Sequence, residues 1–497
     1  MLRITKTPGL KFIIPALLAV LLFSCSKSDT STPGNLPVIS GFSFQQSANN
    51  IPVNSSAFIS GTDITIYLPP GTVSNALKAS FTLSGNASVT VSGVDQQSGV
   101  TANDFTHPVT YTISTGGGVT QNYNVTLITD IAAVDQLVSA FMTKYKVPGM
   151  TMSITKDNHL VYTKAYGMAN TSQQQPVNDS SLFRLASDSK QFTSVTIMRL
   201  FDQKKISMTD KIFGNGAILG TTYGSQPYGP GITDITVSDL LHHTSGGWST
   251  SGNQYNNFND PMFSNLSMSN AELISWTLNN MPLDTLPNTK FEYSNFGYFL
   301  LARVIEKITG EPYEQAVQDL VLTPCGITDM RIAGNTLAER APNEVVYYNQ
   351  ESQTPYAGLN IHRADGCAGW IASSIDLVKF NTHVNQLNPA TDLLSANAYQ
   401  VMTSTTPVSD GYACGWAVYP DQEGFEHQGS LPGTSSDQAF QTMLMSPSNQ
   451  GNYSFGIVIN TRSLDNNYGN DLDNIFWNAL PNIKSWPSYD LFNTTQP

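Results

Sequence analysis

The chain has 497 residues, of which 40% are hydrophobic and 12% are charged, and its formal net charge is −13. This length allows two or three domains, each with its own hydrophobic core. The negative charge and the lack of a basic run exclude a nucleic-acid backbone as a partner.

The first residues have the features of an export signal. Positively charged residues precede the apolar run FIIPALLAVLLF, which is too short to span a bilayer and predicts a signal peptide over residues 1–24. The following LFSC resembles a bacterial lipobox, and this resemblance implies cleavage before Cys25 and lipid attachment to its sulfur. A plain secretory signal with an incidental cysteine is the alternative. We therefore expect a lipoprotein of the cell envelope, anchored to a membrane, either periplasmic or at the cell surface.

Residues 25–36 are polar and rich in Ser, Thr and Pro, which predicts a flexible tether. Beyond Cys25, three cysteines remain: Cys325, Cys367 and Cys414. An odd number leaves at least one free thiol, and the absence of a CxxC pair argues against structural zinc. A disulfide between Cys367 and Cys414 stays open.

Residues 37–129 predict an all-β domain. The stretch DITIYLP alternates apolar and polar residues, and FTLSGNASVTVSG predicts a hairpin around Gly85 and Asn86. The stretch VTYTISTGGGVTQNYNVTLI predicts another hairpin around its glycine turn. Several short strands at this spacing are typical of a small β-sandwich.

The phrases LPPGT, LKASF and QQSGVTANDFTHPVTYTI resemble an immunoglobulin-like module of Bacteroidetes surface lipoproteins. This resemblance implies a spacer or a binding module, with cell-wall or glycan contact as its implied partner. Its strands offer no obvious binding site.

Residues 131–485 mix helices and strands without regular alternation, which predicts an α+β domain. Helices are expected over 132–147, after FRLASDSK, over 296–309 where Gly310 ends the helix, and within NDLDNIFWNAL. A hairpin is expected with Asp157 and Asn158 at its turn, and strands in YACGWAVYP, FEHQG and YSFGIVINT. Residues 486–497 are assigned to a C-terminal tail.

The stretch FRLASDSKQFTS contains two serines and a lysine. Residues three apart share a helix face, so Ser187 can meet the amine of Lys190 while Ser189 points elsewhere. This spacing predicts Ser187 as a nucleophile beside its base. The structural alternative is that Ser187 only caps the helix.

Two further polar clusters follow in the chain. FEYSNFGY contains Tyr293 and Asn295, and HQGSLPGTSS contains His427, Gly429 and Ser430. Each cluster alone is a weak signal. The order S-x-x-K, Y-x-N, H-x-G along one chain is much more specific.

With these motifs the chain resembles the penicillin-recognising serine hydrolases, which include class C β-lactamases, D,D-carboxypeptidases and related esterases and peptidases. The phrases LLHHTSGG, FEYSNFGYFLLARVIEKITG, GWIASSIDLVKF and GSLPGTSS extend the resemblance over residues 131–485. It implies an antiparallel sheet flanked by helices beside a mostly helical subdomain, with the site between them.

The resemblance also implies roles. Ser187 is acylated, and Lys190 and Tyr293 form a coupled acid–base pair that shares one proton. Tyr293 protonates the leaving group and later activates water, and Asn295 holds the substrate amide and orients Lys190. The backbone N–H groups of Ser187 and Ser430 form the oxyanion hole.

The third motif departs from many β-lactamases, which have lysine where this chain has His427. Because histidine titrates near pH 6.5, attraction of a substrate carboxylate is expected to be weaker and pH-dependent. Together with Gly429 and Ser430, His427 is assigned to substrate binding. The alternative is a strand histidine bonded to a loop.

Other polar residues receive structural interpretations. Adjacent His242 and His243 point apart, and no HxHxD or HExxH is present, so neither a metal nor another cofactor is expected. Asp188 is interpreted as a helix-start carboxylate, and Trp370 as packing. Trp248 is either a substrate wall or core. The absence of G-x-S-x-G argues against an α/β-hydrolase.

The sequence therefore predicts an exported serine hydrolase that acts on a small peptide, ester or β-lactam-like substrate. A peptidase, carboxypeptidase or esterase is favoured. The alternatives are a true class C-like β-lactamase and a catalytically silent surface binding protein.

Overall fold

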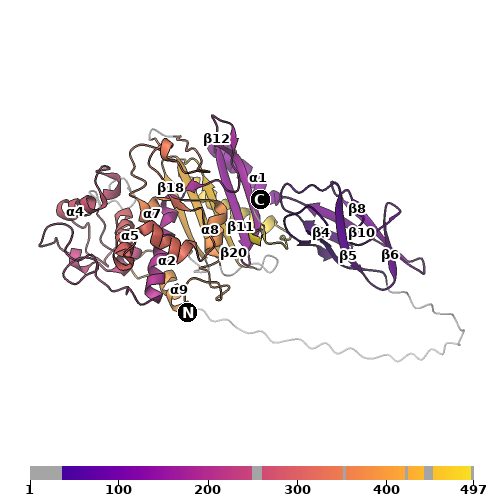
Figure 1. Cartoon of the computed structure of the whole chain (residues 1–497), viewed down its shortest axis with the longest axis horizontal. Helices are drawn as coiled ribbons and strands as arrows, with labels where there is room; N and C mark the ends of the chain where they lie inside the picture. The colour runs from indigo at the N-terminus through magenta and orange to yellow at the C-terminus, as the bar shows by residue number, and fades with distance from the viewer. Residues whose placement is uncertain (1–35, 249–259, 351–353, 420–423, 442–450, 494–497) are drawn as a thin grey trace, which may run out of the picture.

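The computed structural model describes residues 36–248, 260–350, 354–419, 424–441 and 451–493. The predicted signal peptide, Cys25 and all of the tether except its last residue lie outside this range. A small β-sandwich and a larger α+β domain lie end to end along the long axis of the molecule (Figure 1). The α+β class and the all-β N-terminal domain are confirmed.

The sandwich has two sheets. In spatial order the first contains β2 (Ser55–Ser56), β1 (Ile39–Phe44), β5 (Leu77–Leu83) and β8 (Ala102–Asn103). The second contains β3 (Phe58–Ser60), β4 (Asp63–Tyr67), β10 (Thr120–Ile128), β9 (Val109–Thr115), β6 (Ala87–Val91) and β7 (Val94–Asp95). Between the sheets Phe42, Phe44 and Tyr111 pack edge to face.

One of the two predicted hairpins in this domain is wrong. β9 and β10 pair antiparallel as expected. β5 and β6, on either side of Gly85 and Asn86, pair with different partners and belong to different sheets. The Gly85 turn therefore carries the chain from one sheet of the sandwich to the other. Each of the two strands has one apolar face, and that face is buried equally well whether the strands lie in the same sheet or in opposite sheets.

The C-terminal segment joins the two domains. Ser488 Oγ donates to the Ser56 carbonyl at 2.8 Å and accepts from its N–H at 2.9 Å, and Asp490 Oδ1 accepts from the Leu160 N–H at 2.9 Å. An apolar cluster spans the same junction and contains Val53, Leu160, Val378, Tyr489 and Leu491. The described part of the segment assigned to a tail, 486–493, is thus packed against both domains.

The larger domain is built on a seven-stranded antiparallel sheet. Its spatial order is β13 (Gln175–Pro176), β12 (His159–Asn170), β11 (Gly149–Lys156), β20 (Tyr453–Ile459), β19 (Thr434–Gln441), β18 (Gly424–Leu431) and β17 (Ala417–Val418). The predicted β11–β12 hairpin is confirmed, and both turn residues, Asp157 and Asn158, have positive φ as a tight hairpin turn requires. A small sheet contains β14 (Phe183–Arg184), β16 (Trp370–Ala372) and β15 (Arg331–Ile332).

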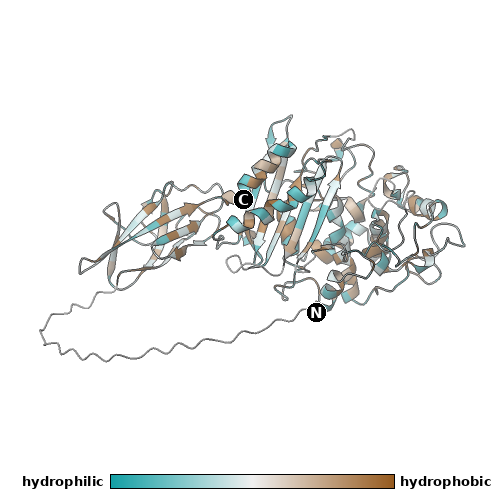
Figure 2. Cartoon of the chain, turned by 180° about the vertical axis from the view of Figure 1, so that it is seen from behind, coloured by the Kyte–Doolittle hydropathy of each residue, from teal (hydrophilic) through white to brown (hydrophobic). Residues whose placement is uncertain are grey.

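Helices cover both faces of the seven-stranded sheet. The described α-helices are α1 (Ala132–Tyr145), α2 (Ser189–Asp202), α3 (Val237–Leu241), α4 (Asn270–Asn280), α5 (Asn295–Thr309), α6 (Tyr313–Val317), α7 (Asp365–Ala368), α8 (Ser374–Asn381), α9 (Ala396–Thr403) and α10 (Tyr468–Ala479). On what we call the back face, α1 and α10 lie across the strands, and each carries both hydrophobic and hydrophilic residues (Figure 2). α8 packs on the opposite, front face, on the side of the helical subdomain.

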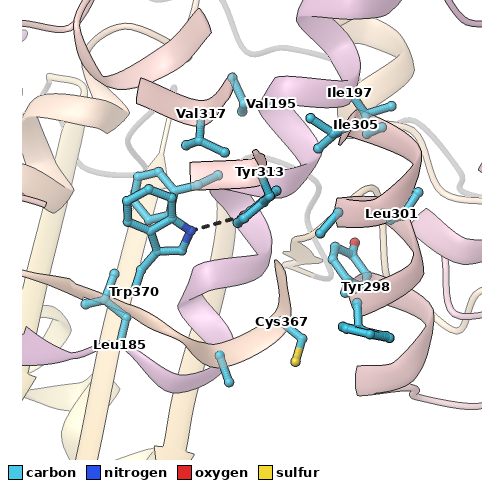
Figure 3. Packing of buried hydrophobic residues seen from close by; sticks show 14 of the residues in the cluster. Leu185, Val195, Ile197, Tyr298, Leu301, Ile305, Tyr313, Val317, Cys367 and Trp370 are labelled. Carbon is cyan, nitrogen blue, oxygen red and sulfur yellow. Dashed lines mark hydrogen bonds between the residues drawn. The ribbon is translucent and has the colours of Figure 1, made fainter. Parts of the chain in front are cut away.

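The helical subdomain surrounds α2, most of whose residues are buried. Trp370 packs against this helix and its indole N–H donates to the Tyr313 hydroxyl at 3.1 Å (Figure 3). The packing role predicted for Trp370 is confirmed. Gly310 ends α5 in the left-handed conformation, with φ of 79°.

Cys325, Cys367 and Cys414 are buried free thiols, so Cys367 and Cys414 are not paired. Within the described segments, no helix combines the length and the apolar character that a membrane crossing needs.

Candidate active site

Ser187 lies in a 3-10 turn, Ala186–Asp188, that leads directly into α2. Ala186 has a φ of 49°, which is unfavourable for a residue with a side chain and indicates local strain. The Ser187 side chain makes no capping bond and lies 3.2 Å from Lys190 Nζ. Ser189 Oγ instead accepts from the Trp370 N–H at 3.2 Å. The structure therefore favours the nucleophile interpretation over the cap.

Lys190 is fully buried and its ammonium nitrogen has three oxygen neighbours. They are Asn295 Oδ1 at 2.7 Å, the Cys367 carbonyl at 2.9 Å and Ser187 Oγ at 3.2 Å. The first two can only accept, so they hold two N–H groups. The third contact can be N–H···O in a charged lysine or N···H–O in a neutral one, because a serine hydroxyl both donates and accepts. A proton can therefore pass between Ser187 and Lys190 without rearrangement.

Tyr293 is half-buried, and its ring centroid lies 4.8 Å from Lys190 Nζ. The centroid of its ring lies 4.2 Å from that of His243, to which the sequence assigned no catalytic role. His243 Nδ1 accepts from the Ser294 N–H at 3.1 Å, so its proton is on Nε2. Burial, helped by the Lys190 cation, holds the pKa of His243 well below its usual value. A neutral His243 thus positions the loop that carries Tyr293.

Asp260 is a second residue that the sequence did not reveal. Its Oδ2 accepts from the N–H groups of Asn295 at 2.7 Å and Phe296 at 3.1 Å, and its Oδ1 from the Met262 N–H at 3.0 Å. Burial raises the pKa of Asp260, while these backbone N–H groups oppose the rise. This carboxylate anchors the start of α5 and so sets where the Asn295 side chain meets Lys190. No motif marks it, because the contact depends on tertiary structure.

β18 brings the third cluster to Ser187. Successive side chains alternate between faces, so His427 and Gly429 point to the front face. A Cβ on Gly429 would lie 1.9 Å from the Leu185 carbonyl oxygen, so only glycine allows the strand to approach the nucleophile turn this closely. Ser430 follows, with an exposed side chain, opposite Ser435.

His427 is only 6% exposed and both of its ring nitrogens have neighbours. Nε2 lies 2.9 Å from the Tyr412 hydroxyl, and Nδ1 lies 2.9 Å from the Gln428 carbonyl and 3.5 Å from Asp188 Oδ1. Asp188 lies at the start of α2 as predicted, but its side chain makes no capping hydrogen bond and is fully buried facing His427. Burial raises the pKa of Asp188, and the neighbouring His427 opposes that rise.

The remaining predicted positions lie outside the catalytic cluster. His242 points away from His243, with its ring nitrogens 2.9 Å from the Ser238 carbonyl and 3.0 Å from the Ser404 carbonyl. Trp248 is buried against Phe296, which settles its interpretation as core.

The described segments contain one group of side chains close enough to share a metal ion. It consists of Glu426, Asp437 and Asp473, on the back face of the sheet. Because successive side chains of β18 point to opposite faces of the sheet, Glu426 lies on the face away from Ser187. This carboxylate group is therefore not part of the described catalytic cluster.

Comparison with known proteins is consistent with this architecture. The family model described as Beta-lactamase matches residues 134–475, and the model described as SGBP, N-terminal, matches residues 39–127. Protein flp of Staphylococcus aureus (strain MRSA252) is 24% identical over 342 residues, which cover 66% of this chain but only 63% of that protein. A putative D-alanyl-D-alanine carboxypeptidase of Escherichia coli (strain K12) is 26% identical over 311 residues, covering 54% of this chain and 68% of its own length.

Solved structures share the fold of the larger domain. D-amino acid amidase from Ochrobactrum anthropi SV3, complexed with L-phenylalanine amide, superposes with a TM-score of 0.55 at 19% identity, covering 71% of this chain and 99% of the amidase. A class C beta-lactamase superposes with the same TM-score and identity, covering 71% of this chain and 96% of the other.

Proposed function

This chain belongs to the beta-lactamase family of serine hydrolases, and we propose that it hydrolyses an amide or ester through acylation and deacylation of Ser187. The observation that carries this proposal is the environment of Lys190. Two fixed acceptors hold the amine so that its remaining position faces Ser187 Oγ. A serine hydroxyl becomes an effective nucleophile when a positioned base takes its proton.

In the first half-reaction, Ser187 Oγ attacks the substrate carbonyl and its proton passes to Lys190. The negative charge on the carbonyl oxygen is stabilised by the N–H groups of Ser187 and Ser430. The C–N or C–O bond then breaks, and the leaving group takes a proton from Tyr293. The close approach of Gly429 to the Leu185 carbonyl supports this arrangement, since it holds the strand beside the nucleophile turn.

In the second half-reaction, water attacks the acyl-enzyme and gives its proton to Tyr293. The bond from the acyl carbon to Ser187 Oγ then breaks, Lys190 returns its proton to Ser187, and the acid is released. Asn295 has two parts in this scheme. Its Oδ1 holds Lys190, and its amide group orients the substrate amide.

The N-terminal sandwich extends the proposal to location. Its match to the SGBP N-terminal model supports glycan or cell-wall contact, and the LFSC sequence supports a lipid anchor at Cys25 in the cell envelope. Membrane fractionation of a Cys25→Ala variant tests the anchor, and recovery of that variant with the membranes would contradict it.

The test of the activity uses residues 26–497 with Ser187→Ala and Ser189→Ala as a matched pair. Intact mass is followed after incubation with a fluorophosphonate and with a fluorescent penicillin. We expect Ser187→Ala to lose the fluorophosphonate adduct and Ser189→Ala to keep it. A penicillin adduct that decays quickly would favour the β-lactamase alternative. No adduct from either reagent would favour a silent binding protein.

A further inference from the structure

The surroundings of His427 determine what charge this residue can present to a substrate. Nδ1 faces two groups that only accept, the Gln428 carbonyl and the Asp188 carboxylate, so Nδ1 carries a proton. Nε2 faces the Tyr412 hydroxyl at 2.9 Å, which can donate to it or accept from it. A neutral His427 and a charged one both satisfy these contacts.

Asp188 is the opposing charge. It is fully buried, neither carboxylate oxygen has a well-aligned hydrogen bond, and its charged neighbour is His427 at 3.5 Å. Because Nδ1 keeps its proton, an ionised Asp188 faces either an imidazolium, with zero net charge, or a neutral imidazole, with one negative charge. While Asp188 is ionised, the pair therefore carries no net positive charge.

The other basic groups near the pair are committed elsewhere. The three neutral oxygens around Lys190 leave its charge in place but direct its amine to Ser187, and Arg462, after β20, is buried and already engaged. No Lys, Arg or His occurs in the sequence of the internal segments outside the described residues, which are 249–259, 351–353, 420–423 and 442–450. The remaining titratable groups that face the pair are Tyr293 and Tyr412, His243, and across the sheet Glu426 and Asp437.

We propose that Asp188 determines specificity by cancelling the charge of His427, so that the enzyme prefers acyl donors whose leaving group carries no carboxylate. This inference rests on the proposed function and narrows its substrate class. It also replaces the carboxylate attraction expected from the sequence, because the pair carries no net positive charge while Asp188 is ionised.

The test compares two thioesters of the same N-acyl-D-alanine, one with mercaptoacetate and one with mercaptoacetamide as leaving group. Ser187 Oγ attacks the thioester carbonyl, its proton passes to Lys190, the C–S bond breaks, and the sulfur takes a proton from Tyr293 and leaves as the thiol. Water then hydrolyses the acyl-enzyme. The measured quantity is the ratio of kcat/KM for the carboxylate-free thioester to kcat/KM for the carboxylate-bearing one. Intrinsic differences between the thiols cancel when variants are compared.

For the wild-type protein we expect a ratio well above one throughout pH 5 to 8. In Asp188→Asn, protonated His427 is no longer cancelled, so at pH 5 the ratio should be about tenfold lower than in the wild type. The double variant Asp188→Asn with His427→Lys carries a net positive charge throughout, so its ratio should be low and independent of pH. Asp376→Asn, a buried carboxylate at the start of α8, is the control and should keep the wild-type ratio.

A wild-type preference for the carboxylate-bearing thioester would overturn the inference. An unchanged ratio in both Asp188 variants, with melting temperatures near that of the wild type, would also overturn it. Turnover of neither thioester counts against it too, and the fluorophosphonate adduct then separates the causes. An adduct on Ser187 leaves the hydrolase intact and removes only the substrate class, whereas no adduct removes the proposed function itself.

Discussion

The two faces of the seven-stranded sheet neutralise buried charge in opposite ways. On the front face, Lys190 is bonded to Asn295 and the Cys367 carbonyl, and Asp188 faces His427. On the back face, the carboxyl groups of Glu426, Asp437 and Asp473 cluster together. Their donors are the Tyr419 hydroxyl at 2.7 Å from Glu426, the Gln428 amide at 3.2 Å from Asp437 and the Trp477 indole at 2.9 Å from Asp473.

Strand β18 contributes to both arrangements through simple alternation, since His427 points forward while Glu426 and Gln428 point back. On the front face, basic side chains lie beside a carboxylate or beside neutral oxygen acceptors, so these basic groups can take up and release protons. The back face pairs acids with one another, and burial together with Asp473 raises the pKa of Glu426 to about 7. The front face is therefore arranged for proton transfer at Ser187, and the back face is stabilised when its carboxyl groups are protonated.

The largest effect should come from filling the space that lets β18 reach the nucleophile. In Gly429→Ala the new methyl group would meet the Leu185 carbonyl at 1.9 Å and Ser436 Oγ at 2.3 Å. The strand must move away from Ser187, so we expect kcat/KM to fall at least about 100-fold and stability to fall by roughly 2–3 kcal/mol. Steady-state kinetics and urea unfolding measure the two losses.

Gly41→Ala in the sandwich is the matched control, because its Cβ would make only an ordinary 3.5 Å contact with Thr82. It should leave kcat/KM unchanged. Wild-type kcat/KM in Gly429→Ala would show that the approach of β18 to Ser187 has no part in catalysis.

A smaller effect is expected from Asp260→Ala. The backbone N–H groups of Asn295, Phe296 and Met262 lose their acceptor, at a cost of about 1–3 kcal/mol. Because Asn295 then holds Lys190 less firmly, kcat should fall about tenfold. Ser269→Ala removes the N-cap of α4, away from the site, and should cost about 1 kcal/mol without changing kcat. Equal kcat values for the two variants would mean that Asp260 is only a helix cap.

These residues also show what sequence could and could not predict. Ser187 and Lys190 were predictable because three-residue spacing on a helix is local geometry. His243 and Asp260 were not, because each acts through backbone N–H groups near Asn295, which lies 52 and 35 residues further along the chain. The same limit explains the Gly85 turn, whose two arms look like a hairpin until the pairing partners of β5 and β6 are known. The position of Asp188 at the helix start was predictable, but its burial against His427 was not, because that contact depends on tertiary structure.

The smallest effect concerns the back face and its response to pH. The pKa of Glu426 is about 7 in the folded protein and 4.5 in an unperturbed glutamate, and burial also raises the pKa of Asp437. A raised carboxyl pKa means that the folded state holds protons that the unfolded chain releases. The stability from these protons is therefore complete below about pH 4.5 and is lost as the pH rises through 7.

Glu426→Gln keeps an acceptor for Tyr419 and cannot ionise. Its melting temperature should match that of the wild type near pH 5 and exceed it at pH 8, by a stability gain of about 1 kcal/mol. Glu272→Gln is the control of opposite sign, since bonds from Ser269 lower the pKa of Glu272 and its contribution is present above that pKa. That variant should lose stability at pH 8. A Glu426→Gln protein no more stable than the wild type at pH 8 would mean that Glu426 is ionised in the fold, and the contrast between the two faces would then fail.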